Sequence, residues 1–248
     1  MAKFKDHFST QSKGYSKFRP SYPRELYSYL SGLCTSHDLV WDCATGTGQA
    51  ARGLSPFFDR IIATDGSAQQ VAKAEGPQNI TFCVATAEES GLEASSVDLV
   101  TVAQALHWFA HDDFFQEAKR ILKPGGILAV WTYNLLGIDQ DIDRIVRLLY
   151  TKVIGEYWPP ERALVDENYG SIDFPFQEIA VPDFNMTASW RLDDLLGYLS
   201  TWSAVVRYKA DKGRDPIEQI RSELSAVWGD DIDEHTVNWP LSFHIGQF

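Results

Sequence analysis

Short apolar runs alternate with amphipathic stretches through the first half of the chain. The runs are rich in Val, Ile, Leu and aromatic residues, which is typical of buried strands, and the stretches between them have apolar residues at helical spacing. Such alternation predicts right-handed crossovers and a mostly parallel sheet covered by helices on both faces. The predicted strands are 39–44, 60–65, 80–85, 97–106 and 126–133, and the predicted helices are 23–34, 47–58, 67–76 and 114–122.

The pattern changes after Asn134, where strands and helices no longer alternate regularly. Trp and Tyr are frequent in this half, so we expect it to complete the sheet and to cap it. Pro240 interrupts the last predicted strand, which indicates an edge position. The predicted helices are 140–158, 192–208 and 215–229; the segment 176–190 is expected to be a strand or a bent hairpin arm, and 236–248 a closing strand.

Composition and charge limit the class of protein and its partners. With 248 residues, 44% of them hydrophobic and 23% charged, the chain can bury one full core, so we expect a single domain. A net charge of −12 argues against nucleic-acid binding, which needs a basic face. No apolar run is long enough to span a bilayer, and the first residues lack the apolar core of a signal peptide.

The cysteines point to a reducing compartment. Cys34, Cys43 and Cys83 are scattered and show no CxxC spacing, so we expect neither a disulfide framework nor a metal site. Cys43 and Cys83 are predicted to be small apolar core residues. We therefore expect a cytoplasmic protein without a membrane or nucleic-acid partner, either a monomer or a homodimer.

A glycine-rich loop, DCATGTGQAA, follows the first predicted strand and opens a helix. Gly46 and Gly48 would let the backbone approach a ligand closely, and the helix start would direct free N–H groups at it. With Ala51 in the third position, the loop satisfies G-x-G-x-x-G/A, and Asp65 ends the next strand where a ribose-binding acid is expected. Taken alone, this motif suggests NAD.

Three details favour S-adenosylmethionine over NAD. Asp42 places a carboxylate just before the glycines, where it would repel a pyrophosphate but attract an ammonium group. A second loop, ATAEE at 85–89, follows the third strand and could bracket an adenine. No third glycine supports the close helix packing of the dinucleotide version. The alternatives are structural: Asp42 as a helix N-cap, Asp65 as a turn former and the glycines as a tight turn.

The segments VWDCATGTG, ATDGS, ATAEES, VDLVTVAQALHWF and ILKPGGILAV resemble, in order and spacing, the motifs of class I S-adenosylmethionine-dependent methyltransferases. The resemblance covers roughly residues 38–132. HFSTQSKGYSKFRPSYP and GYLSTWSAVVRY are similar to the N-terminal segment and the cap helix of the trans-aconitate-methyltransferase-like (methyltransferase type 11) group. This implies a Rossmann-like α/β fold with a mostly parallel seven-stranded sheet, an antiparallel C-terminal strand and a helical cap. The implied parts are an N-terminal lid and helix (1–37), a cofactor-binding core (38–133) and a sheet completion with a cap over the acceptor site (134–248).

The resemblance also implies which residues hold S-adenosylmethionine. The methionine portion, the ribose, the adenine and the floor of the site each receive residues from a different motif, and the N-terminal segment closes over the cofactor carboxylate. Thr86 stands where the family often has an acid, so a backbone contact at Ala87 is the expected adenine contact. The implied cofactor residues are Tyr15, Arg19, Asp42, Ala44, Gly46, Gly48, Asp65, Gln70, Thr86, Ala87, Glu88 and Gln104.

The stretch LVTVAQALHW would carry Gln104, His107 and Trp108 to the ligand-facing ends of the strands. His107 has three readings: a general base, a hydrogen-bond donor that positions the acceptor, or a structural imidazole. Trp108 is expected to cover the core and to wall the acceptor pocket incidentally. Trp131, Tyr133 and Trp202 are further candidates for that pocket, with ordinary core packing as the alternative, above all for Trp131.

The resemblance implies methyl transfer to a small-molecule acceptor, with S-adenosylhomocysteine as the second product and no metal. It suggests a carboxylic acid as the acceptor, which would give a methyl ester. Fold relatives differ in substrate, so the acceptor rests on analogy. The alternatives are a non-catalytic S-adenosylmethionine-binding protein and an NAD-dependent oxidoreductase.

Overall fold

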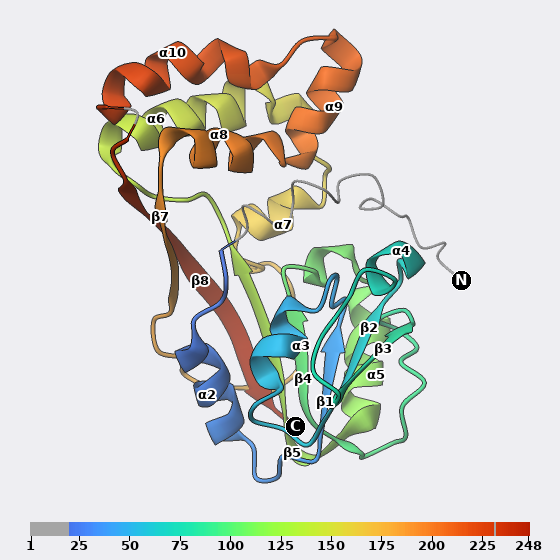
Figure 1. Cartoon of the computed structure of the whole chain (residues 1–248). Coiled ribbons are helices and arrows are strands. Elements are labelled where there is room, and N and C mark those ends of the chain that lie inside the picture. Colours follow the sequence, from blue (N-terminus) through green and yellow to red (C-terminus); the bar gives the residue numbers. More distant parts are fainter. Residues whose placement is uncertain (1–19, 231) are drawn as a thin grey trace.

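A mostly parallel sheet forms the centre of the molecule. The computed structural model describes residues 20–230 and 232–248. The strands are β1 Leu39–Cys43, β2 Arg60–Asp65, β3 Ile80–Val84, β4 Val97–Ala103, β5 Leu122–Tyr133, β6 Gln177–Glu178, β7 Asn185–Trp190 and β8 His235–Gln247. Their order is β3-β2-β1-β4-β5-β8-β6, and β7 pairs with β8 outside this path (Figure 1). The first five strands of this order are parallel, and β8 is antiparallel to β5, β6 and β7, which confirms the predicted class of fold.

The strand ends follow the sequence pattern closely in the core. β2 begins and ends at the predicted residues, 60 and 65. β4 ends at Ala103, before the predicted residue 106, because Gln104 has a φ of 55° and leaves the extended conformation. The strand therefore ends directly before Gln104, the first predicted site residue of this stretch.

The closing strand β8 changes partner along its length. Its second half, 241–247, pairs with β5, and its first half, 235–240, pairs with β7. Pro240 lies at the changeover, and the next residue, Leu241, donates its N–H to the carbonyl of Phe184 (2.9 Å). β8 lies between β5 and β6, so the predicted edge position of this strand was wrong. Pro240 is tolerated because it stands where the ladder to β5 ends.

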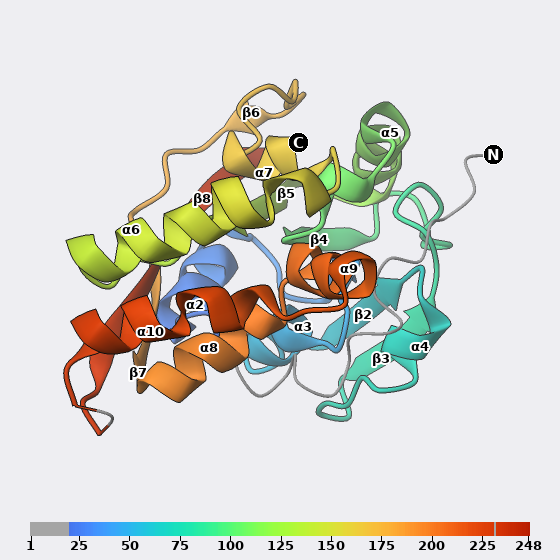
Figure 2. The same ribbon diagram turned by 90° about the horizontal axis from the view of Figure 1, so that it is seen from above.

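Helices cover both faces of the sheet. On one face, α2 Arg24–Leu33 and α3 Gln49–Leu54 bury apolar residues against β1 and β2, and on the other face α5 His111–Ile121 does the same against β1 and β4 (Figures 1 and 2). Only a single turn, α4 Ala68–Val71, follows β2. The two faces thus have separate apolar cores, as the crossover pattern predicts.

A helical cap lies beyond the carboxyl ends of the strands. It consists of α6 Gln140–Leu148, α8 Leu192–Ser200, α9 Ser203–Lys212 and α10 Pro216–Trp228 (Figures 1 and 2). The short α7 Arg162–Asp166 lies between this cap and the sheet (Figure 1). The buried side chains of Ile145, Leu195 and Leu224 belong to the same apolar cluster as those of β1 and β2, so cap and sheet share a core.

Two predicted cap helices are interrupted, so those predictions were wrong. The segment 140–158 leaves α6 at Leu148 and continues as a π-helical turn, Leu149–Val153, and a 3₁₀ turn, Gly155–Tyr157. The segment 192–208 breaks between α8 and α9. The breaks allow Trp158 and Trp202 to pack together, with ring centroids 5.7 Å apart. Tertiary packing of large aromatic side chains therefore overrides the helical spacing.

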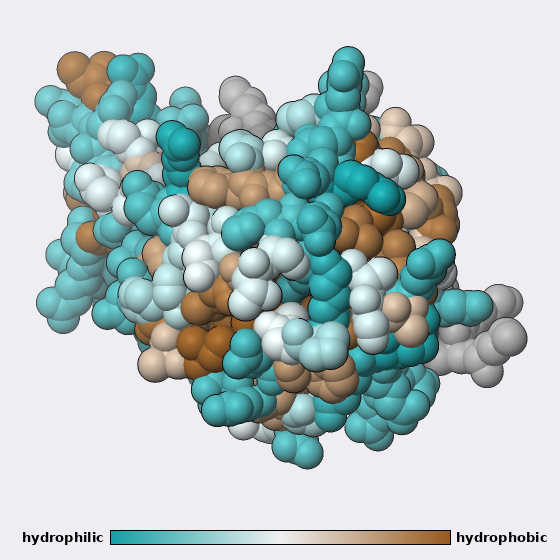
Figure 3. All heavy atoms as spheres, turned by 90° about the horizontal axis from the view of Figure 1, so that it is seen from below, coloured by the Kyte–Doolittle hydropathy of each residue, from teal (hydrophilic) through white to brown (hydrophobic). Residues whose placement is uncertain are grey.

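Hydrophilic residues cover most of the face seen from below, with smaller hydrophobic groups between them (Figure 3). Among the residues that the structure describes, no helix combines the length and the apolar character needed to cross a membrane.

Candidate functional site

The carboxylate of Asp42 organises the glycine loop. It is buried at the end of β1 and accepts hydrogen bonds from the Thr45 hydroxyl (2.5 Å), the Thr101 hydroxyl (2.7 Å) and the Ala51 N–H (3.2 Å). Burial raises the pKa of Asp42 to about 6, although these hydrogen bonds act against the increase. Its contacts tie the loop to α3 and β4, so it shapes the loop, and direct contact with a ligand's ammonium group stays a prediction.

The loop backbone is left-handed at three positions. Ala44, Gly46 and Gly48 have φ values of 54°, 58° and 87°. A Cβ added at Gly48 would lie 2.7 Å from Cε1 of Phe82, whereas one added at Gly46 would meet no atom within 4 Å. Gly48 is therefore required by packing inside the protein, and the space above Gly46 is open to a ligand. The φ of Ala44 is unusual for a residue with a side chain, and such strain is concentrated at functional sites.

Asp65 joins the loops that follow β1 and β2. One carboxylate oxygen accepts the N–H of Gly46 (2.9 Å), and the other accepts the N–H of Ser67 (2.8 Å). Ser67 is the N-cap of α4, where its hydroxyl accepts the N–H of Gln70 (3.4 Å). Asp65 and Gln70 thus lie beside the glycine loop at the carboxyl edge of the sheet, as the motif predicts.

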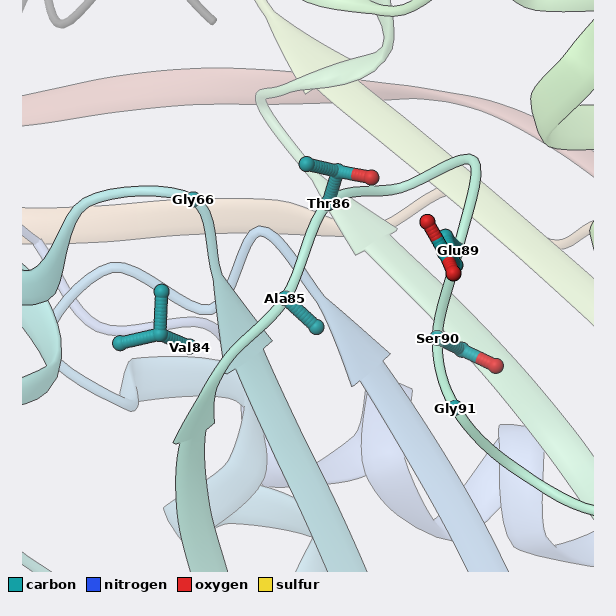
Figure 4. Close-up of a pocket in the computed structure, with 7 residues that line it drawn as sticks. All are labelled: Gly66, Val84, Ala85, Thr86, Glu89, Ser90 and Gly91. Atoms are coloured by element: carbon teal, nitrogen blue, oxygen red, sulfur yellow. The ribbon is translucent and has the colours of Figure 1, made fainter.

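The loop after β3 contributes a third part of this edge. Ala87 is buried, Thr86 is exposed, and Glu88 accepts the N–H of Ala110 just before α5 (3.1 Å). An open pocket borders this loop and the turn after β2 (Figure 4), and its lining residues are Gly66, Val84, Ala85, Thr86, Glu89, Ser90 and Gly91. The loop therefore offers backbone and small side chains to a flat ligand group.

Gln104 fastens the end of β4 to β5. Its amide nitrogen donates to the carbonyl of Tyr133 (2.8 Å), and its amide oxygen accepts the hydroxyl of Thr132 (2.7 Å). Its backbone N–H donates to the carbonyl of Trp131 (2.9 Å). These bonds hold its left-handed backbone in place, so Gln104 is fixed at the point where the strand order changes between β1 and β4, and its role as the floor of the site stays a prediction.

His107 lies in a 3₁₀ turn, Leu106–Trp108, just after Gln104 in the chain. Its Nδ1 is 2.9 Å from the hydroxyl of Tyr169, and its ring lies 4.7 Å from that of Trp108. Burial lowers the pKa of His107 to about 3, with smaller contributions from Arg162 and His111. The imidazole is therefore neutral near pH 7, and its Nε2 has no hydrogen-bond partner within residues 20–230 and 232–248.

Arg162, a cation at the start of α7, acts electrostatically on this imidazole. The Nε of Arg162 donates to the hydroxyl of Tyr150 (2.7 Å) and lies 3.2 Å from the carboxylate of Asp166. One terminal amino group is 3.5 Å from the side-chain oxygen of Asn134, which directly follows β5. The guanidinium lies 5.1 Å from the ring centre of Trp158 and 5.5 Å from that of Tyr150. The two rings are themselves 4.8 Å apart, so the charge lies beside a pair of packed aromatic rings.

The three aromatic residues predicted for the acceptor pocket have different surroundings. Trp202 is half-buried and packs against Tyr150 with ring centres 5.7 Å apart, so it belongs to the group around Arg162. Trp131 is fully buried under Tyr22, which is the core alternative that the sequence left open. Tyr133 is also buried, and its carbonyl anchors Gln104.

Similarity to known sequences identifies the family. Residues 41–130 match the methyltransferase domain family. A Dictyostelium discoideum protein described as a methyltransferase is 35% identical over 226 residues, which cover 90% of this chain and 86% of the relative. The chain belongs to the class I S-adenosylmethionine-dependent methyltransferases.

Two further similarities agree with this assignment. A Saccharomyces cerevisiae protein described as an S-adenosylmethionine-dependent methyltransferase is 34% identical, with 83% of each chain covered. A solved structure from Anaeromyxobacter dehalogenans, described as a type II methyltransferase, has a TM-score of 0.88 and 39% identity, and covers 93% of this chain and 98% of that chain. The protein is therefore a methyltransferase that uses S-adenosylmethionine, and the NAD-dependent oxidoreductase is excluded.

The edge of the sheet fits this cofactor. The open space above Gly46, the strained Ala44 beside it and the carboxylate of Asp65 lie together at the strand-order change, where α/β sheets bind their ligands. Tyr15 and Arg19, predicted to close over the cofactor, lie outside the described residues. The described chain starts beside the loop, because Gln49 donates its side-chain amide to the carbonyl of Pro20 (2.8 Å).

Sequence reasoning missed Arg162, Asn134 and Tyr169. No motif or periodicity marks them, and α7 itself was not predicted. The one local signal was the sequence Asn168-Tyr169-Gly170, which is typical of a turn. In the structure, Asn168 and Tyr169 both have left-handed backbones, with φ values of 54° and 62°.

Proposed function

We propose that this methyltransferase transfers the methyl group of S-adenosylmethionine to a small-molecule carboxylate and forms a methyl ester. The observation that carries the proposal is the neutral imidazole of His107, bonded to Tyr169 and within the electrostatic influence of Arg162. A hydroxyl or carbon acid must lose a proton for methyl transfer, and an amine that arrives protonated must lose one first, whereas a carboxylate has none to lose. A group whose pKa is about 3 is a poor general base near neutral pH, so the site suits an acceptor that arrives as an anion.

The chain's own task is to orient the acceptor and to exclude water. When bound, S-adenosylmethionine supplies a methyl group on a positively charged sulfur, which is already activated for displacement. Holding the acceptor in line with that group can lower the barrier by several kcal/mol. In our proposal His107 contributes by donating a hydrogen bond from Nε2 to an acceptor oxygen, and it moves no proton.

Tyr169 selects the form of His107 that can donate this bond. Burial raises the pKa of the Tyr169 hydroxyl well above its ordinary value, so the hydroxyl keeps its proton. The Thr132 side chain and backbone groups of Leu106 and His107 favour negative charge on the same oxygen; in our proposal this oxygen accepts on that side and donates its hydrogen to Nδ1. The ring proton of the neutral imidazole must then sit on Nε2.

The cofactor-binding residues remain proposals in the order that the motifs gave. The loop at Ala44, Gly46 and Gly48, held by Asp42, would receive the methionine portion, and Asp65 the ribose, with Gln70 along its edge. The loop containing Thr86, Ala87 and Glu88 would receive the adenine, and Gln104 would form the floor. The support is their shared position at the carboxyl edge of β1, β2, β3 and β4.

A small acceptor is supported by the cap. α7 and the cap helices lie over the carboxyl ends of β4 and β5 (Figure 1). The rings of Tyr150, Trp158 and Trp202, which belong to the cap, pack together. Such a covered, aromatic site suits a small ligand better than a protein or a nucleic acid. A cytoplasmic location, consistent with three free cysteines in the described chain, and the monomer or homodimer remain predictions for fractionation and sedimentation experiments.

The test is a product assay with purified protein and methyl-labelled S-adenosylmethionine. Benzoate, phenylacetate, butyrate and octanoate are each compared with the corresponding alcohol and amine. We expect S-adenosylhomocysteine and an alkali-labile methyl ester with at least one acid, and no ether or N-methyl product. Transfer to alcohols or amines alone would overturn the carboxylate proposal, and cofactor binding without product from any class would favour the non-catalytic alternative.

A further inference from the structure

We propose that Arg162 binds the anionic group of the acceptor and so determines that this enzyme selects acids. This inference rests on the proposed carboxylate acceptor and names the residue that recognises it. Arg162 is far in sequence from the cofactor motifs, and no family motif includes it. Arg162 has unused hydrogen-bond donors, lies beside Asn134 at the end of β5, and is flanked by aromatic rings.

The guanidinium has more donors than the protein uses. Its side chain is only 21% exposed, and a guanidinium carries five N–H groups. Only Nε makes short contacts, to Tyr150 and Asp166; one terminal amino group reaches Asn134 at 3.5 Å, and the other has no hydrogen-bond partner in the described part of the chain. These donors are not among the buried atoms without a partner, so they reach solvent and are accessible to an anion.

The terminal amino groups lie at the acceptor side of the sheet. Asn134, the partner of one of them, directly follows Tyr133, whose carbonyl is bonded to Gln104. The charge of Arg162 also acts on His107, because it is the second-largest cause of the low pKa of that imidazole. A carboxylate near His107 would therefore lie within the field of the guanidinium.

One segment fixes both groups. Asp166 and Tyr150 share a hydrogen bond of 2.6 Å and hold the Nε edge of Arg162, so the forked end stays available. Two residues later, Asn168 accepts the side-chain amide of Asn134 (2.8 Å), and the adjacent Tyr169 reaches His107. The strained backbone after α7 thus sets the cation and the imidazole in one arrangement, which is what recognition of a planar carboxylate requires.

The rest of the protein would not attract an acid. The net charge is −12, so the general field repels anions, and a single cation embedded among aromatic rings has to overcome it locally. Asp166 does not cancel this role, because its side chain is 45% exposed and its carboxylate lies on the Nε edge.

The experiment compares carboxylates with neutral analogues of the same shape. Benzoate, phenylacetate, butyrate and octanoate are each paired with their carboxamides and titrated into protein saturated with S-adenosylhomocysteine. The variants are Arg162→Gln, Arg162→Lys and the control Arg207→Gln, which removes a cap arginine that donates to the carbonyl of Tyr157 (3.2 Å). Affinity for S-adenosylhomocysteine reports that each variant is folded.

We expect the wild type to prefer the acid in at least one pair. Arg162→Gln should reduce that preference about tenfold or more, Arg162→Lys should keep part of it, and Arg207→Gln should keep all of it. An undiminished preference in Arg162→Gln, or no preference for the acid in any pair of the wild type, would overturn the inference. If Arg162→Gln still esterifies an acid with an unchanged KM, this inference fails while the proposed function stands; if only alcohols or amines are methylated, the proposed function itself fails.

Discussion

The glycine loop after β1 and the cap beyond β5 differ in how their polar side chains are satisfied. In the loop region, Asp42, Asp65 and Gln104 direct their oxygens at backbone or hydroxyl groups of the protein. Beside the cap, His107 and Arg162 keep at least one N–H or ring nitrogen without a partner among the described residues, and aromatic rings surround them. The first region is built as a rigid frame, and the second retains groups for a ligand.

This difference explains why the two regions should respond differently to mutation. Changes in the loop region should disturb a packed backbone and so reduce cofactor affinity together with stability. Changes beside the cap should leave cofactor affinity intact and alter the acceptor or the rate of methyl transfer. The predictions below separate these two responses.

The largest effect is expected for Gly48→Ala. The new Cβ would lie 2.7 Å from Phe82, and the φ of 87° disfavours any side chain, so the loop must shift. We expect cofactor affinity, measured by calorimetry with S-adenosylhomocysteine, to fall about a hundredfold. Gly213→Ala is the control, since Gly213 has a φ of 65° at the end of α9 with open space around it. It should lower stability slightly and leave cofactor affinity unchanged; an equal loss of affinity in both variants would contradict the rigid-frame account.

Asp42 should give the stability curve a distinctive dependence on pH. Its folded pKa of about 6 exceeds the ordinary value of 3.8, so the folded state binds this proton more tightly. Stability should therefore fall as pH rises from about 4 to about 6, by up to roughly 3 kcal/mol. Urea unfolding across this range should show that slope in the wild type and its loss in Asp42→Asn.

Asp98 provides a control of opposite sign. Hydrogen bonds from Lys123 and Ser36 lower the pKa of Asp98 despite its burial. Its contribution to the free energy of unfolding is therefore present above the ordinary pKa and is lost as the pH falls through the folded value. Asp98→Asn should remove that acid-side loss and keep the slope between about pH 4 and 6. If the free energy of unfolding of Asp42→Asn kept the same slope between about pH 4 and 6, the claim that the buried carboxylate of Asp42 causes this slope would be contradicted.

A smaller effect is expected for Tyr169→Phe, which removes the hydroxyl from Nδ1 of His107. The imidazole could then adopt either tautomer, so the rate of methyl transfer should fall about tenfold while cofactor affinity stays normal. The pH profile should stay flat, because burial and Arg162, the main causes of the low pKa of His107, are unchanged. Tyr157→Phe, which removes a hydroxyl bonded to Asp211 (2.6 Å), is the control and should change neither the rate nor the cofactor affinity; an unchanged rate in Tyr169→Phe would contradict the role of Tyr169 in holding the tautomer of His107.

The loop region was largely predictable from sequence because its signals are local. β1 and β2 end next to Asp42 and Asp65, and one short motif places both beside Gly46. The acceptor side was not predictable to the same degree. Arg162 and Tyr169 are brought to the ends of β4 and β5 by the packing of α7. The spacing of apolar residues in the sequence does not predict this helix or its position. The cap helices were found, but their breaks depend on how Trp158 and Trp202 pack, which the sequence pattern does not record.

The central claim is that His107 acts as a neutral donor to an acid and not as a base. The measurement is single-turnover methyl transfer across pH for the wild type and His107→Gln, with the acid identified in the product assay. Since the wild-type imidazole has a pKa of about 3, we predict a flat profile between about pH 5.5 and 8, and a loss of less than about tenfold in His107→Gln, which keeps a hydrogen-bonding side chain. A rising limb centred near pH 6.5 in the wild type, with a loss of about 10²–10⁴-fold in His107→Gln at normal cofactor affinity, would contradict the claim and make His107 a general base.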